Sequence, residues 1–231
     1  MKERVSAVIL SAGNGSRMKL NNITKQELII GGETVLHRTV SIFNSVEEIS
    51  EIVVVVRYDQ LDFAREELAS FDKVSSIVVG GYTRFESAKI GFSSISDMAE
   101  YVAIHDVARC FITEDMIRLV ISDAVKYGAA TAASAVTDTV KLIDGEGCVK
   151  GTVNRDTVVT VQTPQIFNTN LYREALASVV DTSRITDDNM LLEAIGVGVH
   201  CTLTGKGNIK LTTEEDIRYA NYLVDMEKEN E

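Results

Sequence analysis

Near the amino terminus, a glycine-rich turn and two cations that follow it have residue types and spacing suited to chemistry. An apolar run, Val5–Leu10, leads into the turn Ser11-Ala12-Gly13-Asn14-Gly15, and Arg17 and Lys25 come next. Backbone N–H groups of such a turn come close to phosphate oxygens, and an arginine and a lysine nearby neutralise the phosphate charge. The pattern therefore predicts a site for a nucleoside triphosphate.

The same glycines admit a second interpretation, because Gly13-x-Gly15 also begins the dinucleotide-binding fingerprint G-x-G-x-x-G. Met18 stands at the third glycine position, and the next strand-like run ends only at Asp59, too far away for the usual ribose-binding acid. The phosphate-binding pattern that ends in Gly-Lys-Ser/Thr is missing from the sequence as well. On the glycines alone an ordinary turn remains an open alternative, and the two cations favour the triphosphate site.

Charge is unevenly distributed along the chain. The 231 residues carry a formal net charge of -11, which disfavours nucleic acid as a partner. Residues 1–31 nevertheless contain five basic and only two acidic side chains. A protein that binds small polyanions can gather its cations in one cleft while its general surface stays acidic, and this distribution fits that arrangement.

Length and composition indicate an ordinary globular protein. No apolar stretch reaches membrane-spanning length and no apolar signal region follows the first residues, so we expect a soluble cytoplasmic protein that does not bind membranes. Cys110, Cys148 and Cys201 lack metal-ligand spacing and are expected to be reduced thiols. The three histidines are equally scattered, which argues against a zinc site.

The elements that must position the turn follow an α/β rhythm. Amphipathic stretches such as Leu36–Phe43 and Phe63–Phe71 separate four strand-like runs: Val5–Leu10, Ile52–Val56, Val74–Val79 and Val102–Ile104. This alternation predicts an α/β fold with a doubly wound, mostly parallel (Rossmann-like) sheet and right-handed crossovers. Ligands of such sheets bind at the carboxyl ends of the strands. We therefore expect three segments to meet there: Ser11–Arg17, Gly80-Gly81 and His105-Asp106.

Later elements carry recognisable helix starts. Thr113 is placed to be the N-cap of a helix through Met116 to Ala124, and another helix is expected from Asn170. A strand is expected near Val197–Leu203. Thr213-Glu-Glu-Asp216 gives the last helix a capping-box start, with acidic residues that suit the helix dipole.

Between Thr137 and Thr163 the α/β rhythm is interrupted. Strand-like segments flank the turn Asp144-Gly145-Glu146-Gly147, which predicts an inserted β-hairpin arm over residues 137–163 of an otherwise single domain, 1–231. An isolated hairpin is too thin to have its own core, so it must pack on something. We expect it to dock on a second subunit and form a homodimer, and packing against its own domain is the alternative.

Eight motifs in unbroken order from Val5 to about Leu223 resemble those of the 2-C-methyl-D-erythritol 4-phosphate cytidylyltransferase family. They are Ser11-Ala12-Gly13-x-Gly15-x-Arg17-Met18, Lys25-Gln26, Gly80-Gly81-x-x-Arg84-x-x-Ser87, His105-Asp106-x-Ala108-Arg109, Asp138-Thr139-x-Lys141, Gln162-Thr163-Pro164-Gln165, Thr186-Asp187-Asp188 and Asn208-Ile209-Lys210-x-Thr212. The resemblance implies a nucleotidyltransferase that transfers CMP from CTP to 2-C-methyl-D-erythritol 4-phosphate. The products would be 4-diphosphocytidyl-2-C-methyl-D-erythritol and pyrophosphate, in non-mevalonate isoprenoid biosynthesis, with Mg²⁺ on the triphosphate.

The resemblance also implies roles for individual residues. Binding of the nucleotide falls to Ser11, Ala12, Gly13, Gly15, Gly81, Tyr82, Ser87 and Asp106, of which Asp106 lies by the ribose and the metal and binds Mg²⁺ directly or through water. The catalytic cations are Arg17, Lys25, Arg155 and Lys210. The sugar-alcohol phosphate contacts Arg109, Thr139, Thr163 and Thr186, with Thr139 and Arg155 supplied by the partner subunit.

The implied chemistry needs no general base. A phosphate monoester has a second pKa near about 6, so its oxygen is already a largely anionic nucleophile at neutral pH. Alignment and charge stabilisation then suffice, and the absence of a Ser-His-Asp or Cys-His constellation is expected. For the same reason we interpret His105 as a structural turn residue and not as an acid or base.

The sequence departs from the family pattern at a few positions. Thr24 replaces a usual proline before Lys25, with one extra residue after Arg17, and Ser11 replaces a common alanine. In the fourth-strand motif, Val107 and Cys110 replace the usual alanine and proline. Three alternatives stay open: a ribitol 5-phosphate cytidylyltransferase, a nucleotide-binding regulator without catalytic activity, and a nicotinamide-dependent reductase.

Overall fold

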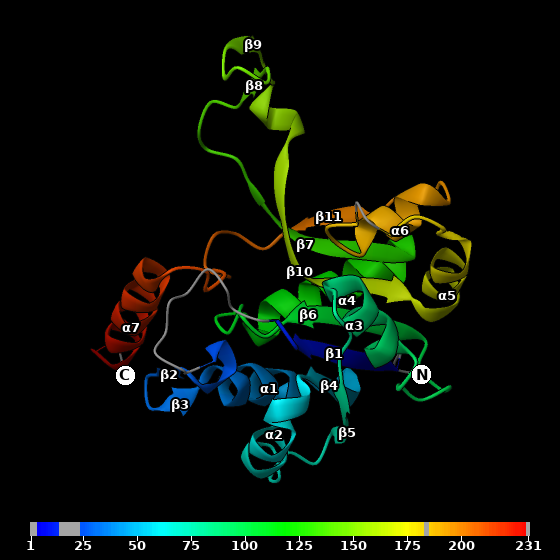
Figure 1. Cartoon of the computed structure of the whole chain (residues 1–231), viewed down its shortest axis with the longest axis vertical. Helices are drawn as coiled ribbons and strands as arrows, with labels where there is room; N and C mark the ends of the chain where they lie inside the picture. Colours follow the sequence, from blue (N-terminus) through cyan, green and yellow to red (C-terminus); the bar gives the residue numbers. More distant parts are fainter. Residues whose placement is uncertain (1–3, 14–23, 183–184, 230–231) are drawn as a thin grey trace.

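A seven-stranded mixed sheet forms the centre of the molecule. The computed structural model describes residues 4–13, 24–182 and 185–229. In this part of the chain the strand order is β11-β7-β10-β6-β1-β4-β5 (Figure 1). The strands are β1 (Val5–Ser11), β4 (Ile49–Val56), β5 (Val74–Val79), β6 (Tyr101–Asp106), β7 (Ala129–Ala135), β10 (Val159–Asn168) and β11 (His200–Leu203).

The first four large strands form the parallel, doubly wound half that the sequence predicts. β1 pairs in parallel with β4 and with β6, and β4 pairs in parallel with β5. The chain therefore winds outward from β1 to β5 and then crosses back to β6 on the other side of β1. β10 is antiparallel to both β6 and β7, which makes the whole sheet mixed, while β11 runs parallel to β7.

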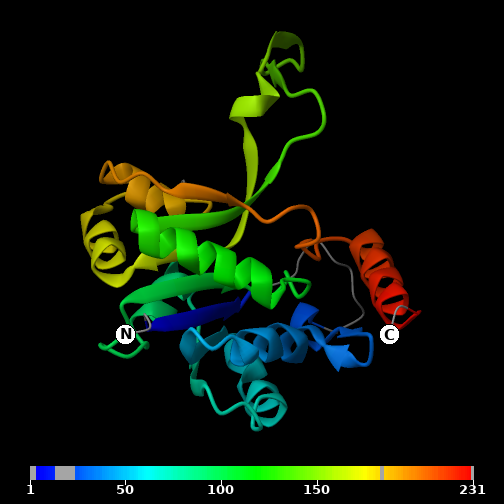
Figure 2. The ribbon, with the colours of Figure 1, turned by 180° about the vertical axis from the view of Figure 1, so that it is seen from behind.

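Helices cover both faces of the sheet, and alternate side chains of β1 pack against the helices on opposite faces. Val5, Ala7 and Ile9 belong to one buried cluster while Val8 and Leu10 belong to the other, as the two-residue period of a strand requires. The first cluster includes side chains of α1 (Val35–Ser45), α2 (Leu61–Glu67), α4 (Glu114–Tyr127) and α7 (Glu214–Glu229). The second includes side chains of α3 (Arg84–Phe92), α5 (Thr169–Ser178) and α6 (Asn189–Ala194) (Figures 1 and 2).

The local signals in the sequence set several element boundaries correctly. The strand Val74–Val79 is found with its predicted ends, and the strands predicted at Val5–Leu10, Ile52–Val56 and Val102–Ile104 are longer by one, three and three residues. Thr113 caps α4 by accepting a 3.3 Å hydrogen bond from the backbone N–H of Met116. The predicted capping box of α7 is also present, because the Asp216 carboxylate accepts the Thr213 N–H at 2.7 Å.

Strand β7 has no clear strand pattern in the sequence. Its segment Ala129–Ala135 consists of alanine, threonine and serine, without the large β-branched and aromatic residues that mark strands. Small side chains fit there because β7 is inside the sheet, between β10 and β11, with six of its residues buried. Packing against its neighbours, and not strand propensity, makes this segment a strand.

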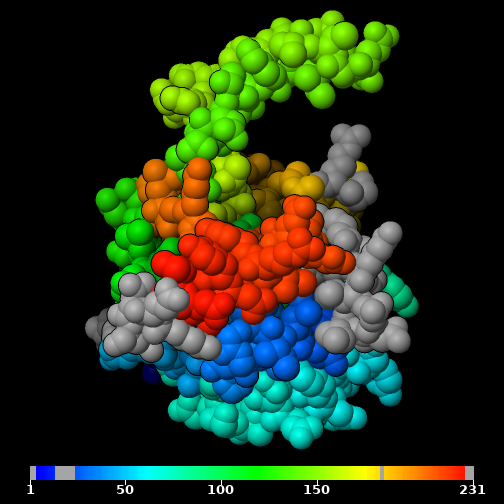
Figure 3. Space-filling view, turned by 90° about the vertical axis from the view of Figure 1, so that its left-hand side faces the viewer, coloured from blue at the N-terminus to red at the C-terminus, as the bar shows by residue number. Residues whose placement is uncertain are grey.

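An arm projects from the sheet between β7 and β10. The short strands β8 (Lys141–Ile143) and β9 (Val149–Thr152) form an antiparallel hairpin, and the turn η3 (Arg155–Thr157) follows. The arm, residues 136–158, stands away from the rest of the molecule (Figure 3). The last five residues of the predicted hairpin, 159–163, belong to β10 and therefore to the main sheet.

β2 (Ile29–Ile30) and β3 (Glu33–Thr34) form a small hairpin, and β2 packs against α7. A Cβ built on Gly31 would lie only 2.5 Å from a side-chain methyl of Val224, on α7, and Gly31 has φ +67°. Only glycine fits this turn without strain. The carboxyl-terminal helix therefore packs on the β2–β3 hairpin that follows the turn η1 (Lys25–Glu27) in the sequence (Figure 3). Within the described residues, no helix is long and apolar enough to cross a membrane.

Candidate active site

A cavity of about 390 Å³ opens at the carboxyl ends of β1 and β6, where the winding of the sheet changes direction. This is the place at which open α/β sheets bind their ligands. Described residues of all three segments that the sequence predicts to meet line this cavity: Ser11–Gly13, Gly81 and Asp106. The cavity is lined by Leu10, Ser11, Ala12, Gly13, Lys25, Gln26, Arg57, Gly81, Tyr82, Thr83, Arg84, Ser87, Asp106, Val107, Ala108 and Lys210.

Glycines allow the turn after β5 to press against the end of β1. A Cβ built on Gly80 would lie 2.6 Å from the Cβ of Ala12 and 2.7 Å from the hydroxyl of Ser87. Any larger residue would therefore push the two walls of this cavity apart. Ser87 is buried and donates a 3.0 Å hydrogen bond to the carbonyl oxygen of Thr83, whereas Tyr82 is fully exposed at the rim.

The glycine-rich turn contributes its first half to this cavity. Ser11, Ala12 and Gly13 line it, and the buried hydroxyl of Ser11 has no hydrogen-bond partner among the described residues. Gly15 and Arg17, which the sequence assigns to the phosphates, lie outside the described residues. Lys25, on the turn η1 (Lys25–Glu27), lines the same cavity, and its Nζ donates to the carbonyl oxygen of Leu211 at 2.8 Å.

Asp106 ends β6 and is held by two cations. Arg84 Nε lies 3.1 Å from Oδ1, and Lys210 Nζ lies 2.6 Å from Oδ2. Burial raises the pKa of the Asp106 carboxyl, but Arg84 and Lys210 outweigh that effect and hold the pKa well below its usual range. Asp106 is therefore ionised at neutral pH, and among the described residues it is the only acidic side chain that lines this cavity.

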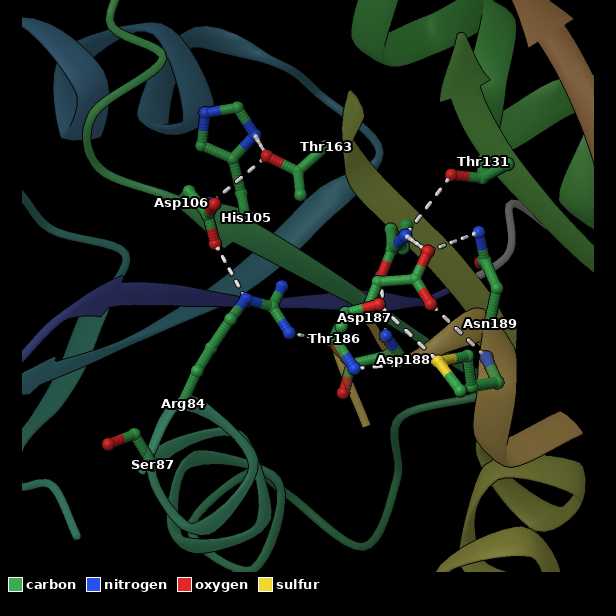
Figure 4. A network of polar contacts seen from close by, with 12 residues as sticks. Arg84, Ser87, His105, Asp106, Thr131, Thr163, Thr186, Asp187, Asp188 and Asn189 are labelled. Atoms are coloured by element: carbon green, nitrogen blue, oxygen red, sulfur yellow. Dashed lines mark hydrogen bonds and ion pairs between the residues drawn. The ribbon is translucent and has the colours of Figure 1, made fainter. Parts of the chain in front are cut away.

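The sequence assigns no role to Arg84 or to its second acidic partner, Asp188. Arg84 Nη1 lies 2.6 Å from Asp188 Oδ2, so one guanidinium bridges Asp106 and Asp188 (Figure 4). Burial lowers the pKa of Arg84, but the two carboxylates outweigh this and raise it further above its usual value. Both residues belong to motifs that carry the family resemblance, so the sequence marks them as candidates. It does not show that they lie close together in the fold.

A second cavity, of about 400 Å³, lies beside the first and shares Lys210 with it. Arg109 and Lys206 also line it, so three cations line this space together with two carboxylates, Asp138 and Asp216. Arg109 Nη1 donates to the carbonyl oxygen of Asn208 at 2.9 Å, while its buried Nε has no partner among the described residues. Burial lowers the pKa of Arg109. This cluster suits a dianionic phosphate, which would accept from the remaining guanidinium donors.

Other predicted site residues lie outside both cavities. Thr163 is buried, and its hydroxyl accepts the Asp106 N–H at 3.0 Å, so it supports Asp106 from behind. Thr186 is exposed and faces the sulfur of Met190 at 3.4 Å. Thr139 and Arg155 are exposed on the arm, where Arg155 Nη1 donates to the carbonyl oxygen of Thr137 at 3.0 Å.

His105 has the structural role expected of it, but on strand β6 and not in a turn. Its ring is fully buried, with Nδ1 3.2 Å from the Thr163 hydroxyl and Nε2 3.3 Å from the carbonyl oxygen of Arg109. Burial lowers the pKa of His105 to about 3, so the imidazole is neutral at physiological pH. Neither cavity is lined by it.

Comparisons with known proteins agree on one family. The family model described as 2-C-methyl-D-erythritol 4-phosphate cytidylyltransferase matches residues 5–226. Enzymes with this name from Clostridium botulinum strain 657 and Clostridium tetani are each 38% identical, over 92% and 94% of this chain and 93% and 89% of theirs.

Solved structures give the same result. The 4-diphosphocytidyl-2C-methyl-D-erythritol synthase of Anaerococcus prevotii superposes with a TM-score of 0.84 and 34% identity, covering 97% of both chains. The 2-C-methyl-D-erythritol 4-phosphate cytidylyltransferase of Thermus thermophilus has a TM-score of 0.75 and 28% identity, covering 96% of this chain and 99% of its own.

Proposed function

This chain belongs to the 2-C-methyl-D-erythritol 4-phosphate cytidylyltransferase family, and on that premise we propose which substrate each of its two cavities binds. The protein is a cytidylyltransferase that makes the cytidine diphosphate derivative of methylerythritol in the non-mevalonate pathway. Its substrates are CTP and methylerythritol phosphate.

We assign CTP to the first cavity. The observation that carries this assignment is the meeting of Ser11–Gly13, Lys25 and Asp106 at the carboxyl ends of β1 and β6. The backbone of the turn and Arg17 would contact the phosphates, Gly81, Tyr82 and Ser87 the cytosine, and Asp106 the ribose. The tight packing of Gly80 on Ala12 supports a recess shaped for a flat base.

We assign the acceptor phosphate to the second cavity, where Arg109 and Lys210 supply positive charge. Because Lys210 lines both cavities, it lies between the acceptor and the nucleotide and is suited to stabilise charge that passes from one to the other. Thr163 and Thr186, which the family resemblance assigns to the acceptor, do not line this cavity. In the proposed homodimer, Thr139 and Arg155 of the arm complete the partner's site. The exposed apolar residues Leu142, Ile143 and Val149 on the arm support its docking on a second subunit.

The reaction is an in-line displacement at the α-phosphorus of CTP. An oxygen of the acceptor phosphate forms a new P–O bond, the bond to the bridging oxygen of pyrophosphate breaks, and that electron pair leaves with pyrophosphate. No proton has to be removed from the nucleophile at neutral pH. Lys25 and Arg17 would act by stabilising the extra charge on the five-coordinate phosphorus, and the neutral, buried His105 takes no part.

The residues present fit a Mg²⁺ ion that takes most of its ligands from the nucleotide. Mg²⁺ typically uses one or two carboxylates together with phosphate oxygens and water. Asp106 supplies one ionised carboxylate at the first cavity, and the described residues contain no group of three or more potential protein ligands. Asp106 would therefore hold the ion, directly or through water, and the metal would supply charge neutralisation to the triphosphate. The cytoplasmic location expected from the sequence stays a prediction.

The test is pyrophosphate release with each of the four nucleoside triphosphates, offered with methylerythritol phosphate or ribitol 5-phosphate. We expect release only with CTP and methylerythritol phosphate. Release with ribitol 5-phosphate instead would assign the acceptor pocket to the other alcohol. Binding of CTP without any release would identify a nucleotide-binding regulator and contradict the proposed mechanism.

A further inference from the structure

Arg84 connects two carboxylates that belong to different parts of the molecule. It is the first residue of α3 and lines the first cavity, as does Asp106. Asp188 is 1% exposed, stands at the N-cap position of α6 without a side-chain capping hydrogen bond, and does not line either cavity. The guanidinium uses Nε for Asp106 and Nη1 for Asp188, so each carboxylate has its own donor (Figure 4).

Asp188 is itself fixed from two further elements. The buried phenol of Tyr172, on α5, donates to Asp188 Oδ1 at 2.6 Å. The backbone N–H of Asp188 donates to the side-chain oxygen of Gln165, on β10, at 2.9 Å, and Gln165 Nε2 donates to Asp187 at 3.1 Å. A network in which each member is bound at several points keeps its geometry, because moving one member leaves buried polar groups unpaired.

The other oxygen of Asp106 is also fixed. Lys210 Nζ binds Oδ2 while Arg84 Nε binds Oδ1, so the plane of the carboxylate is set by the two cations together. Lys210 can supply charge alone, but a single ammonium cannot set that plane. The direction that Asp106 presents to the cavity therefore depends on where Asp188 holds Arg84.

We infer that Arg84 is a positioning residue, anchored by Asp188, that sets the orientation of the Asp106 carboxylate toward the nucleotide. The inference rests on the proposed function of the first cavity. It makes Asp188 a determinant of CTP binding although Asp188 lies outside the cavity.

The test measures the Kd for CTP by calorimetry, with Mg²⁺ present and without the acceptor. It compares the unmodified enzyme, Asp188→Asn, Asp106→Asn and the double variant that carries both changes. Asn keeps an oxygen for Tyr172 but removes the charge that holds Arg84. We expect Asp188→Asn to raise the Kd for CTP about tenfold, the order expected for a lost charge-assisted hydrogen bond. On Asp106→Asn the further effect of Asp188→Asn should fall below about twofold, since no carboxylate remains to be oriented.

Tyr172→Phe is a second, milder variant in case Asp188→Asn folds poorly. It removes only the phenol oxygen that holds Asp188, and we expect about a threefold rise in Kd that again disappears on Asp106→Asn. Glu114→Gln is the matched control, because Arg118 on α4 also joins carboxylates of different elements, Glu114 on the same helix and Glu48 just before β4, and none of these residues lines the cavity. Its Kd for CTP should equal that of the unmodified enzyme.

An unchanged Kd in both Asp188→Asn and Tyr172→Phe would overturn the inference. An equally large effect with and without Asp106→Asn would also overturn it, because Arg84 would then act by another route, such as direct contact with CTP. Failure of the proposed function looks different: the unmodified enzyme itself would bind no CTP or release no pyrophosphate.

Discussion

The Lys25 ammonium donates a 2.8 Å hydrogen bond to the carbonyl oxygen of Leu211, a residue 186 positions further along the chain. Leu211 is itself held by its backbone N–H, which donates to the carbonyl oxygen of Ala108 at 2.8 Å. The loop after β6, the segment before α7 and the turn η1 are therefore tied together at the edge of the first cavity. The carboxyl-terminal segment thus holds an amino-terminal cation in place.

Lys25→Ala and Arg17→Ala should each lower kcat far more than they raise the KM for CTP. Both cations are proposed to strengthen their contact as charge builds up on the α-phosphorus, and losing such a contact costs on the order of 10²–10³ in rate. Steady-state kinetics with CTP varied at saturating acceptor measures the two effects separately. Retention of the original kcat in either variant would remove that residue from the catalytic machinery.

Gly80→Ala should weaken CTP binding and the fold together. The new Cβ would lie 2.6 Å from the Cβ of Ala12 and 2.7 Å from the Ser87 hydroxyl, so the cavity wall must move. Overpacking of this kind costs about 1–3 kcal/mol of unfolding free energy, and we expect a higher KM for CTP as well. Chemical denaturation and kinetics measure the two effects. Gly198→Ala is the control, because a Cβ there meets nothing within 4 Å.

Mixing two inactive variants tests whether the arm completes the partner's site. Lys25→Ala breaks a site from within its own subunit, whereas Arg155→Ala is proposed to break the site of the other subunit. After random exchange of subunits about half of the dimers are mixed, and each mixed dimer has one intact site, so about a quarter of the full activity should return. The measurement is pyrophosphate release before and after refolding the two variants together.

No recovery from that mixture would mean that Arg155 serves its own subunit, as its 3.0 Å hydrogen bond to the Thr137 carbonyl oxygen already allows. A second measurement addresses the dimer directly. Ile143→Asp places a charge among the exposed apolar residues of the arm, and we expect a monomeric mass by light scattering. A dimer that survives this change would place the interface elsewhere.

Asp216→Asn should lower thermal stability at neutral pH and lose this effect in acid. Burial raises the pKa of Asp216, but the backbone N–H groups of Thr213 and Thr212 and the charge of Lys25 lower it further than that. A carboxylate whose pKa is lower in the folded than in the unfolded state stabilises the fold above its unfolded pKa of about 4. That contribution is lost as the pH falls through the lower, folded value.

Calorimetric scans at pH 7 and at pH 2.5 measure this dependence. Loss of a helix cap is expected to lower the Tm by about 2–6 °C at pH 7. The difference between Asp216→Asn and the unmodified protein should shrink toward zero at the lower pH. Glu215→Gln removes a charge from the same first turn of α7 and should have a smaller effect. A Tm difference independent of pH would mean that the ionised carboxylate is not the cap.

Local patterns in the sequence determined the parallel half of the sheet and its cavity. Four runs of branched apolar residues with helical patterns between them can form little other than a doubly wound sheet. The position of the cavity then follows, because Ser11, Gly81 and Asp106 lie at or within two residues of the carboxyl ends of such strands. Family motifs added the residue types that the cavities contain, Lys25, Arg109 and Lys210 among them. These features depend on residues close together in the sequence.

Only the tertiary structure decided the contacts between distant residues. β7 is a strand because β10 and β11 enclose it, not because of its alanines. Thr163 lies behind Asp106 and not in a cavity, since its hydroxyl is used by the Asp106 N–H. Arg84 pairs with Asp188, which is 104 positions away, and no periodicity or spacing in the sequence predicts this pair. Which donors meet which acceptors is fixed by how helices pack on the sheet, and that depends on the whole chain at once.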